Sequence, residues 1–309
     1  MRVVVTGATG FVGKWLVREL IKQGTDVTVI VRNKDRVPAV WNDYSVEVVE
    51  ASLNRIALLE KGSFSKDTYD IFYHFAWAGT SGMERADTRL QLGNAQAACE
   101  AVMLAKKLGC SSFVNAGSIM EYEAMQYIVQ DSAIPGMGNI YSIAKMTADF
   151  MAKTVASREG IRYINVIISN IYGAGEKSAR FLNTVLRKML ANERIPLTHG
   201  EQLYDFIYVT DAVRAIVYAG INGENNSSYY IGNPCQHPLK EFILRMKELV
   251  ESKSELAFGE VPYIGARLSY QEFDTKKLAN MGFVMEIPFE EGINLTKRWI
   301  MEEEDEYQI

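Results

Sequence analysis

Apolar and polar residues follow two distinct patterns of spacing along the first half of the chain. Short apolar runs, many of them β-branched, predict buried strands at Val3–Thr6, Val27–Val31, Tyr69–Ala76, Ser112–Ala116 and Arg162–Ile168. Between them, apolar residues at helical spacing predict helices at Phe11–Gln23, Leu90–Leu108 and Tyr141–Arg158. Strands that alternate with helices are typical of a doubly wound parallel sheet with helices on both faces, so the chain is predicted to have an α/β fold.

A glycine-rich turn, TGATGFVG, joins the first predicted strand to the first helix. Gly7 permits the tight turn, Gly10 lets the backbone approach a pyrophosphate, and Gly13 allows close packing of helix on strand. The helix N-terminus then faces the phosphates, so this context predicts a Rossmann dinucleotide site rather than a sharp turn alone. The residues expected to contact the cofactor here are Gly7, Thr9, Gly10, Phe11, Val12, Gly13 and, after a later strand, Ala76.

The alternation of predicted strands and helices gives way to a different pattern after Asn170. Helical patterns at Ala179–Ala191 and Leu239–Ser252 are separated by loops rich in Gly, Asn and Pro, while Asp205–Gly220 reads as a strand followed by a helix. We expect this last segment to return to the first lobe. The predicted division is therefore a dinucleotide-binding Rossmann domain, residues 1–168 plus about 203–222, and a smaller C-terminal α/β substrate lobe, about 169–202 plus 223–309.

The end of the second predicted strand bears on the choice between NAD and NADP. An acidic residue there would accept a hydrogen bond from the ribose 2′-hydroxyl, whereas an arginine would bind a 2′-phosphate. The sequence has Val31 where the acid is expected, followed by Arg32, with Lys34 and Arg36 close by. A guanidinium forms charge-assisted, bidentate contacts with a phosphate, so the pattern favours NADP over NAD. The alternative is that Arg32 is a solvated cation at the end of a strand.

Tyr141 and Lys145 form a YxxxK pair, in YSIAK, at the start of a predicted helix. Residues four apart share a helix face, and a cation beside a phenol lowers the phenol pKa. Tyr141 is therefore a candidate to exchange a proton with a carbonyl or hydroxyl group while hydride moves to or from a nicotinamide. Ser118, which follows an earlier strand, is a candidate to hydrogen-bond the same substrate oxygen. Because YxxxK pairs are common on protein surfaces, this pair gains its weight from Ser118.

Together with TGATGFVG and YSIAK, the positions of Asn94 and Ser118 make the chain resemble the extended short-chain dehydrogenase/reductase family, the NAD-dependent epimerase/dehydratase group that acts on nucleotide sugars. The resemblance continues through SNIYGAG (169–175), HGEQLYDFIYVTDAV (199–213) and FDTKKLANMGF (273–283), so it covers nearly the whole chain. It implies a nucleotide-sugar substrate and a homodimer formed through the helices at Leu90–Leu108 and Tyr141–Arg158. The catalytic residues that it implies are Asn94, Ser118, Tyr141 and Lys145, the last two also at the cofactor.

Departures from the family pattern narrow the reaction. Family dehydratases resemble one another in carrying an Asp-Glu pair directly after the catalytic Ser or Thr. This chain has Ile119 and Met120 at those positions, so dehydration is not expected. Tyr204 and Ile167 stand where the family usually has arginines, so a substrate diphosphate would need other cations, such as Lys177. The residues expected to contact the substrate are Trp77 as a stacking platform, Ser118, Asn170, Arg180, Tyr204 and Arg267.

Composition and charge argue against several other classes of protein. Hydrophobic residues make up 48% of the chain and its formal net charge is −5, which is ordinary for a globular protein and gives no electrostatic case for binding nucleic acid. Cys99, Cys110 and Cys235 lack CxxC spacing, and no metal site is expected. The first residues read as a strand rather than a signal peptide, and no apolar run is long enough to span a membrane, so a cytoplasmic protein is predicted.

Several functional hypotheses follow. The leading one is an NADPH-dependent reductase of a keto group, of the 4-keto-6-deoxy type, on a nucleotide sugar, because Arg32 favours NADP and net reduction draws on NADPH. The second is a nucleotide-sugar 4-epimerase that retains bound NAD. The third, from another class, is a dinucleotide-binding sensor or scaffold without chemistry, against which the complete set of Ser118, Tyr141 and Lys145 argues. Reduction of a carbonyl compound other than a sugar also stays open, because the family's diphosphate arginines are missing.

Overall fold

The computed structural model describes residues 1–129, 135–263 and 268–302, which form two compact units. Unit 1 comprises Met1–Ile168 and Val213–Tyr230, and unit 2 comprises Ser169–Ala212 and the described residues from Ile231 onward. Residues 203–212 therefore belong to unit 2, and residues 223–230 belong to unit 1. The second segment lies in unit 1 because it carries most of strand β11 (Ser227–Ile231), which pairs at the edge of the unit 1 sheet.

Unit 1 is built on a seven-stranded sheet with the strand order β11-β6-β5-β4-β1-β2-β3. All the neighbouring pairs from β6 to β3 are parallel, and the order reverses at β1, so the predicted doubly wound α/β fold is confirmed. The strands besides β11 are β1 (Arg2–Thr6), β2 (Asp26–Val31), β3 (Glu47–Glu50), β4 (Ile71–His74), β5 (Ser112–Ser118) and β6 (Arg162–Ile168).

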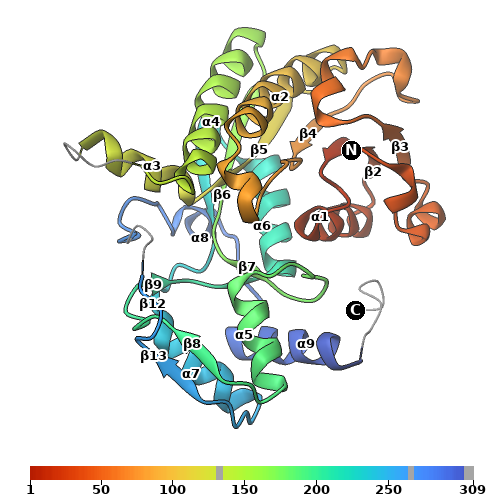
Figure 1. Cartoon of the computed structure of the whole chain (residues 1–309). Helices are drawn as coiled ribbons and strands as arrows, with labels where there is room; N and C mark the ends of the chain where they lie inside the picture. The colour runs from red at the N-terminus through yellow and green to blue at the C-terminus, as the bar shows by residue number, and fades with distance from the viewer. Residues whose placement is uncertain (130–134, 264–267, 303–309) are drawn as a thin grey trace. The chain divides into compact units, whose positions relative to one another are not determined.

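Helices cover both faces of this sheet (Figure 1). On one face, α2 and α4 lie side by side over a buried cluster that includes Phe72 and Phe113, whose rings stack at 5.5 Å. Tyr73 points to the opposite face, because side chains alternate along a strand, and its hydroxyl lies beside Gly220 of α6. The helices of unit 1 are α1 (Phe11–Lys22), α2 (Thr88–Lys107), α3 (Met120–Val129), α4 (Asn139–Glu159) and α6 (Val209–Asn222), which begins in unit 2.

Short 3₁₀ helices fill the connections between the first strands of unit 1 and the loop after β4. They are η1 (Lys34–Arg36), η2 (Ala39–Tyr44), η3 (Leu53–Leu58), η4 (Lys61–Ser63) and η5 (Gly82–Ala86). The first two crossovers of the sheet therefore differ: α1 links β1 to β2, whereas η1 and η2 alone link β2 to β3.

Unit 2 is a smaller α/β body, and the strands among its described residues pair only two by two. Its aromatic core brings Phe206, Phe242 and Phe289 together, with ring centroids 4.9–5.9 Å apart. Three two-stranded pairings surround it: β7 (Ile171–Tyr172) with β10 (Ile207–Tyr208), β9 (Leu203–Tyr204) with β12 (His237–Pro238), and β8 (Ile195–Leu197) with β13 (Leu256–Phe258). Its helices are α5 (Phe181–Leu190), α7 (Leu239–Leu249), α8 (Lys277–Asn280) and α9 (Phe289–Glu302).

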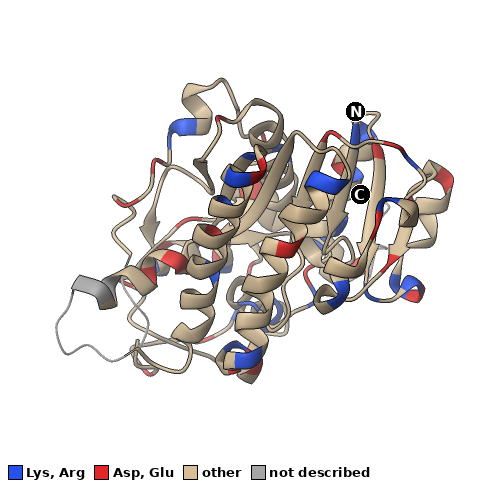
Figure 2. Ribbon diagram, turned by 90° about the horizontal axis from the view of Figure 1, so that it is seen from above, with Lys and Arg blue, Asp and Glu red and all other residues tan. Residues whose placement is uncertain are grey.

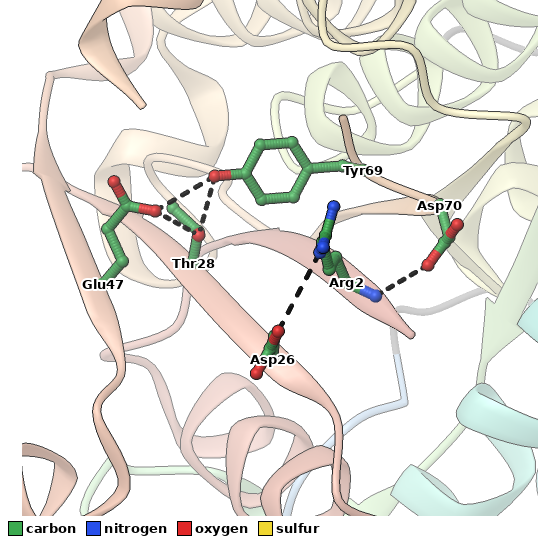
Figure 3. A network of polar contacts seen from close by, with 6 residues as sticks. All are labelled: Arg2, Asp26, Thr28, Glu47, Tyr69 and Asp70. Carbon is green, nitrogen blue, oxygen red and sulfur yellow. Dashed lines mark hydrogen bonds and ion pairs between the residues drawn. The ribbon is translucent and has the colours of Figure 1, made fainter. Parts of the chain in front are cut away.

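A polar network ties the first strands of unit 1 together near their amino ends (Figure 3). Thr28 and Tyr69 both donate hydrogen bonds to the Glu47 carboxylate, at 2.8 and 3.0 Å, and the backbone N–H of Arg2 donates to Asp70 at 2.7 Å. Burial alone would raise the pKa of Glu47, but its hydrogen bonds hold that pKa below the ordinary value. The network fixes β1, β2 and β3 at the end opposite to the candidate functional residues, which follow the carboxyl ends.

Charged residues of both signs are interspersed along the elements (Figure 2), in keeping with the small net charge of the chain. Among the described residues, no helix is both long enough and apolar enough to cross a membrane.

Candidate functional site

The glycine-rich turn after β1 has the close contacts that its spacing predicts. Gly7 has a φ of +74°, and a Cβ atom there would come within 2.6 Å of the backbone nitrogen of Ala76. A Cβ atom on Gly13 would overlap the carbonyl oxygen of Gly7, whereas one on Gly10 would lie 3.3 Å from the same oxygen. Since the first turn of α1 has no acidic residue, its free N–H groups can receive a phosphate. The residues present therefore fit the pyrophosphate of a dinucleotide.

Thr6 and His74 fasten the end of β4 to this turn. The Thr6 hydroxyl oxygen accepts hydrogen bonds from the backbone N–H groups of Phe75 and Ala76, both at 3.2 Å, so it donates its own hydrogen to Nδ1 of His74 at 3.0 Å. Burial, with a smaller contribution from the Lys145 charge, lowers the pKa of His74 to about 3. His74 is therefore a neutral residue that holds the strand end, not a base.

Arg32 follows β2 directly and is exposed to solvent. Its guanidinium makes no hydrogen bond or ion pair with any of the described residues. The neighbouring strand places Glu50 in register with Val31, and the Glu50 carboxylate lies 4.0 Å from Nζ of Lys34. No sequence motif singles out Glu50, because only the register of β3 on β2 brings it to this edge. The edge thus holds an unpartnered arginine, within the described chain, and a loosely paired carboxylate.

Tyr141 and Lys145 lie in the first turns of α4, and both side chains are buried. The Lys145 ammonium donates a hydrogen bond to the carbonyl oxygen of Ala116 at 2.8 Å and lies 6.0 Å from the centroid of the Tyr141 ring. Burial lowers the pKa of Lys145 to about 8, and the Glu121 charge acts in the opposite direction. The predicted YxxxK pair is therefore a buried amine beside a buried phenol, not a surface pair.

Trp77 contacts both members of that pair. Its ring centroid lies 3.7 Å from Nζ of Lys145, and its ring packs edge-on against Tyr141 with centroids 6.0 Å apart. A hydrogen bond of 2.8 Å from Nε1 to Oε1 of Gln91 fixes the indole. The Arg85 guanidinium also contacts Tyr141, 4.2 Å from the centroid of its ring. No motif singled out Arg85, since its contact with Tyr141 depends on the path of the loop that contains η5.

Asn94 braces the same loop through two backbone contacts. Its side-chain amide accepts a hydrogen bond from the N–H of Ala78 at 3.0 Å and donates one to the Ala78 carbonyl at 2.9 Å. Gln91, one helical turn earlier, donates to the carbonyl of Gly79 at 2.8 Å. In these contacts Asn94 positions the backbone that follows Trp77.

Ser118 is the last residue of β5, and the chain turns directly into α3. Its hydroxyl oxygen accepts from the backbone N–H of Met120 at 3.2 Å, which leaves the hydroxyl hydrogen to be donated elsewhere. Its own N–H donates to the carboxyl group of Glu121 at 2.8 Å. Sequence reasoning missed Glu121 because it weighed only Ile119 and Met120, although Ser-x-x-Glu before a helix is a capping signal.

The other residues predicted to contact substrate belong to unit 2. Asn170 donates to Asp205 at 3.4 Å, and Tyr204 is a half-buried ring in β9, whose pKa burial raises to about 12. Arg180 is half exposed and lies 3.4 Å from the buried carboxylate of Glu176. The structure brings Trp77, Tyr141 and Lys145 together in unit 1. Asn170, Arg180 and Tyr204 belong to unit 2, and Arg267 falls outside the described residues.

No three His, Cys, Asp or Glu side chains in the part of the chain that the structure describes are grouped as a metal site. The site of unit 1 is built instead from a glycine turn, a helix N-terminus, and a buried hydroxyl, phenol and amine. Such a turn on a doubly wound sheet defines a Rossmann-type dinucleotide-binding protein.

The comparison with protein families makes the assignment specific. Residues 3–232 match the model of the NAD dependent epimerase/dehydratase family, so the chain belongs to that family. The resemblance drawn from the sequence motifs is thereby confirmed.

Similar proteins carry several activities in their names. The chain is 25% identical over 262 residues to a CDP-abequose synthase of Yersinia pseudotuberculosis, covering 84% of this chain and 88% of that protein. It is 24% identical over 316 residues to UDP-glucuronic acid decarboxylase 1 of Xenopus tropicalis, covering 98% of this chain and 72% of that protein. A UDP-glucuronic acid 4-epimerase from Bacillus cereus, solved with UDP-glucuronic acid and NAD, superposes with a TM-score of 0.80 at 15% identity, covering 98% of this chain and 100% of that one.

Proposed function

We propose that the protein is an NADPH-dependent reductase that acts on a keto group, of the 4-keto-6-deoxy type, of a nucleotide-activated sugar. The observation that carries this proposal is Arg32, an exposed guanidinium that follows β2 and has no partner among the described residues. A free guanidinium at this edge suits the 2′-phosphate that distinguishes NADP from NAD. A reaction that consumes its coenzyme draws on NADPH, whereas an epimerase regenerates the coenzyme that it holds.

The names of the relatives support a nucleoside diphosphate sugar as the substrate. CDP-abequose synthase and UDP-glucuronic acid decarboxylase 1 are both named for sugars linked to a nucleoside diphosphate. The two names differ in nucleotide and in reaction, so the shared chemistry is the activated sugar.

The role that we propose for each residue of unit 1 follows from its contacts. The coenzyme supplies the hydride, and Gly7, Gly10 and Gly13 make room for its pyrophosphate. Tyr141 donates the proton to the keto oxygen, because the buried Lys145 cation lowers the free energy of the phenolate that is left. The Ser118 hydroxyl, whose oxygen already accepts from Met120, donates its hydrogen to the same keto oxygen.

The second candidate is a nucleotide-sugar 4-epimerase with tightly bound NAD. Glu50 is the observation that favours it, since the register of β3 on β2 places a carboxylate beside Val31, where it can accept from a ribose hydroxyl. The 4-epimerase from Bacillus cereus, which binds NAD, has the same fold.

We also propose that the protein forms a homodimer through α2 and α4. These helices carry exposed apolar side chains that a monomer would leave in water, namely Leu92 and Met103 on α2 and Ile143, Phe150 and Met151 on α4. A two-fold contact would bury both sets at once.

Coenzyme titration separates the two candidates. Binding of NADPH and NADH is measured by nicotinamide fluorescence on the wild type, Arg32→Ala, Glu50→Gln and the control Arg158→Ala. The reductase proposal predicts that NADPH binds at least about tenfold tighter than NADH, about 1.4 kcal/mol, and that only Arg32→Ala removes the difference. Equal binding by the wild type, or loss of NADH affinity in Glu50→Gln, supports the epimerase instead.

A further inference from the structure

The ammonium group of Lys145 is buried without an anion beside it. Lys145 lies on α4 and is 6% exposed. Its ammonium donates to the carbonyl oxygen of Ala116 at 2.8 Å, and within the described chain it forms no ion pair. Lysines are rarely buried to this extent unless they are paired, and an ammonium has more N–H donors than one carbonyl satisfies. A group other than a carboxylate is therefore needed to stabilise this charge.

The indole of Trp77 contacts the ammonium directly. The ring centroid lies 3.7 Å from Nζ of Lys145, well within the distance of about 6 Å over which an aromatic face attracts a cation. Tryptophan attracts a cation more strongly than the other aromatic side chains do, and the attraction grows when the pair is removed from water. Trp77 is half-buried and packs against the hydrophobic cluster of unit 1, so this contact is shielded from solvent.

Gln91, a fully buried residue of α2, fixes the orientation of the indole. Its Oε1 accepts a hydrogen bond from Nε1 of Trp77 at 2.8 Å. Its Nε2 donates to the carbonyl oxygens of Gly79 and Glu84, at 2.8 and 3.0 Å. Because both ends of the amide are engaged, the side chain holds the indole and the following loop in one arrangement. The contact between indole and ammonium is therefore built into the free protein.

The acidic residues of α3 do not supply the missing charge. The Glu121 carboxyl group accepts from the N–H of Ser118 at 2.8 Å, and burial raises its pKa to about 8, so it is mostly protonated at neutral pH. Glu123 accepts from the hydroxyl of Ser142 at 2.8 Å. Neither carboxyl group forms an ion pair with Lys145.

The other elements around Lys145 bring no anion to it either. On α4 itself, Asp149 accepts a hydrogen bond from the Tyr163 hydroxyl of β6 at 2.9 Å. His74, at the end of β4, is neutral because burial lowers its pKa to about 3. Arg85, from the loop after β4, is itself a cation. The charge of Lys145 is thus left to the Ala116 carbonyl and the indole face.

We infer that Trp77 is a positioning residue of this site, whose indole face takes the place of a carboxylate beside Lys145 and keeps the buried ammonium charged. A neutral ring stabilises the cation without cancelling its charge, whereas a carboxylate would offset the field that the cation exerts on its surroundings. The inference concerns the free protein. Its consequence for turnover rests on the proposed function, in which the full charge of Lys145 favours the phenolate of Tyr141.

Progressive fluorination of the Trp77 indole tests the inference with little change in the size of the ring. Fluorine withdraws electron density from the ring face and so weakens its attraction for a cation, while the Nε1 hydrogen stays available to Gln91. Monofluoro-, difluoro- and trifluorotryptophan are incorporated at position 77 alone, in protein that carries ¹³C-labelled lysine. The titration of Lys145 is followed by NMR without substrate or coenzyme, and its signal is assigned from its absence in Lys145→Met.

We expect the acid dissociation constant of Lys145 to rise with each fluorine, and at least about tenfold over the series. Burial already lowers the pKa of Lys145 to about 8, so this change brings it close to neutral pH. The control is the same series at position 15, because the Trp15 ring lies 5.0 Å from the Arg18 guanidinium on α1. Fluorine there should leave the constant of Lys145 within about twofold.

A titration of Lys145 that does not respond to fluorine at position 77 overturns the inference, as does an equal response to fluorine at position 15. In turnover, the basic limb of the pH–rate profile should move to lower pH in the same order. If the titration shifts and the profile does not, the inference stands and the roles proposed for Tyr141 and Lys145 are wrong. Failure of the NADPH preference likewise leaves the titration result untouched, because no coenzyme is present in it.

Discussion

Gly13 packs directly against Gly7, so closely that a Cβ atom on Gly13 would overlap the Gly7 carbonyl oxygen and lie 2.8 Å from its carbonyl carbon. Both contacts are with backbone, which cannot move aside. Gly13→Ala should therefore destabilise the protein by about 3 kcal/mol and abolish coenzyme binding, because α1 is forced away from β1. Gly10→Ala, with its nearest contact at 3.3 Å, should cost less than about 1 kcal/mol. Denaturant unfolding of the two variants measures the difference, and equal costs would contradict the packing described.

Removing the Tyr141 hydroxyl tests the assigned proton donor. Tyr141→Phe keeps the ring, with its contacts to Trp77 and Arg85, and should lower turnover by about 10²–10⁴-fold while coenzyme affinity stays within about threefold of the wild type. Ser118→Ala should lower turnover less, because a hydrogen bond is lost and not the proton source. Steady-state rates and coenzyme titration on the same preparations check both. Turnover by Tyr141→Phe at the wild-type rate would exclude the assigned role.

Glu121 should make stability depend on pH. Burial, with the Asp149 charge, raises its pKa from 4.5 to about 8. The folded state then holds a proton that the unfolded state has released, so this contribution to stability is complete below about pH 4.5 and is lost as the pH rises through about 8. Between about pH 5 and pH 8 the wild type should lose about 1–3 kcal/mol of unfolding free energy that Glu121→Gln does not lose. Urea unfolding across that range measures it, with Glu123→Gln as control; parallel curves for the wild type and Glu121→Gln would refute the expectation.

The proposed dimer depends on the exposed apolar residues of α2 and α4. Phe150 is 58% exposed, so Phe150→Glu should fold normally and yet place a charge in the two-fold contact. Light scattering after gel filtration should give twice the chain mass for the wild type and the chain mass for the variant. Leu244→Glu, which changes an exposed apolar residue of α7 in unit 2, serves as control. A monomeric wild type would rule out this assembly.

Local sequence patterns were sufficient to predict those features of the structure that depend on residues close together in the chain. The spacing of Gly7, Gly10 and Gly13 predicted a turn in which the first and third positions leave no room for a side chain. Tyr141 and Lys145, four residues apart, fall on one helix as their spacing required. The strands β1, β2, β4, β5 and β6 and the helices α1, α2 and α4 were likewise visible as apolar runs and helical periodicity, whereas β3 was not predicted.

Contacts between distant segments could not be predicted in the same way. Trp77 and Lys145 are 68 residues apart in the sequence. Trp77 was predicted to stack on substrate, and no sequence pattern indicated that its indole lies over Lys145. Helix α3 was not predicted, because Ile119 and Met120 were considered only for the chemistry of their side chains and not for helical periodicity. The role of β11 as the edge strand of unit 1 likewise depends on its pairing with β6, not on its own composition. The contacts of the predicted substrate residues stay predictions.

Net consumption of coenzyme tests the central claim most directly. The purified protein is mixed with NADPH and, separately, with CDP-linked and UDP-linked 4-keto-6-deoxy sugars, and NADPH absorbance and sugar NMR spectra are followed together. The account predicts that NADPH is oxidised in step with conversion of the keto sugar to an alcohol, and that Tyr141→Phe stops both. Interconversion of 4-epimers without added coenzyme, by protein that carries NAD through gel filtration, would contradict it.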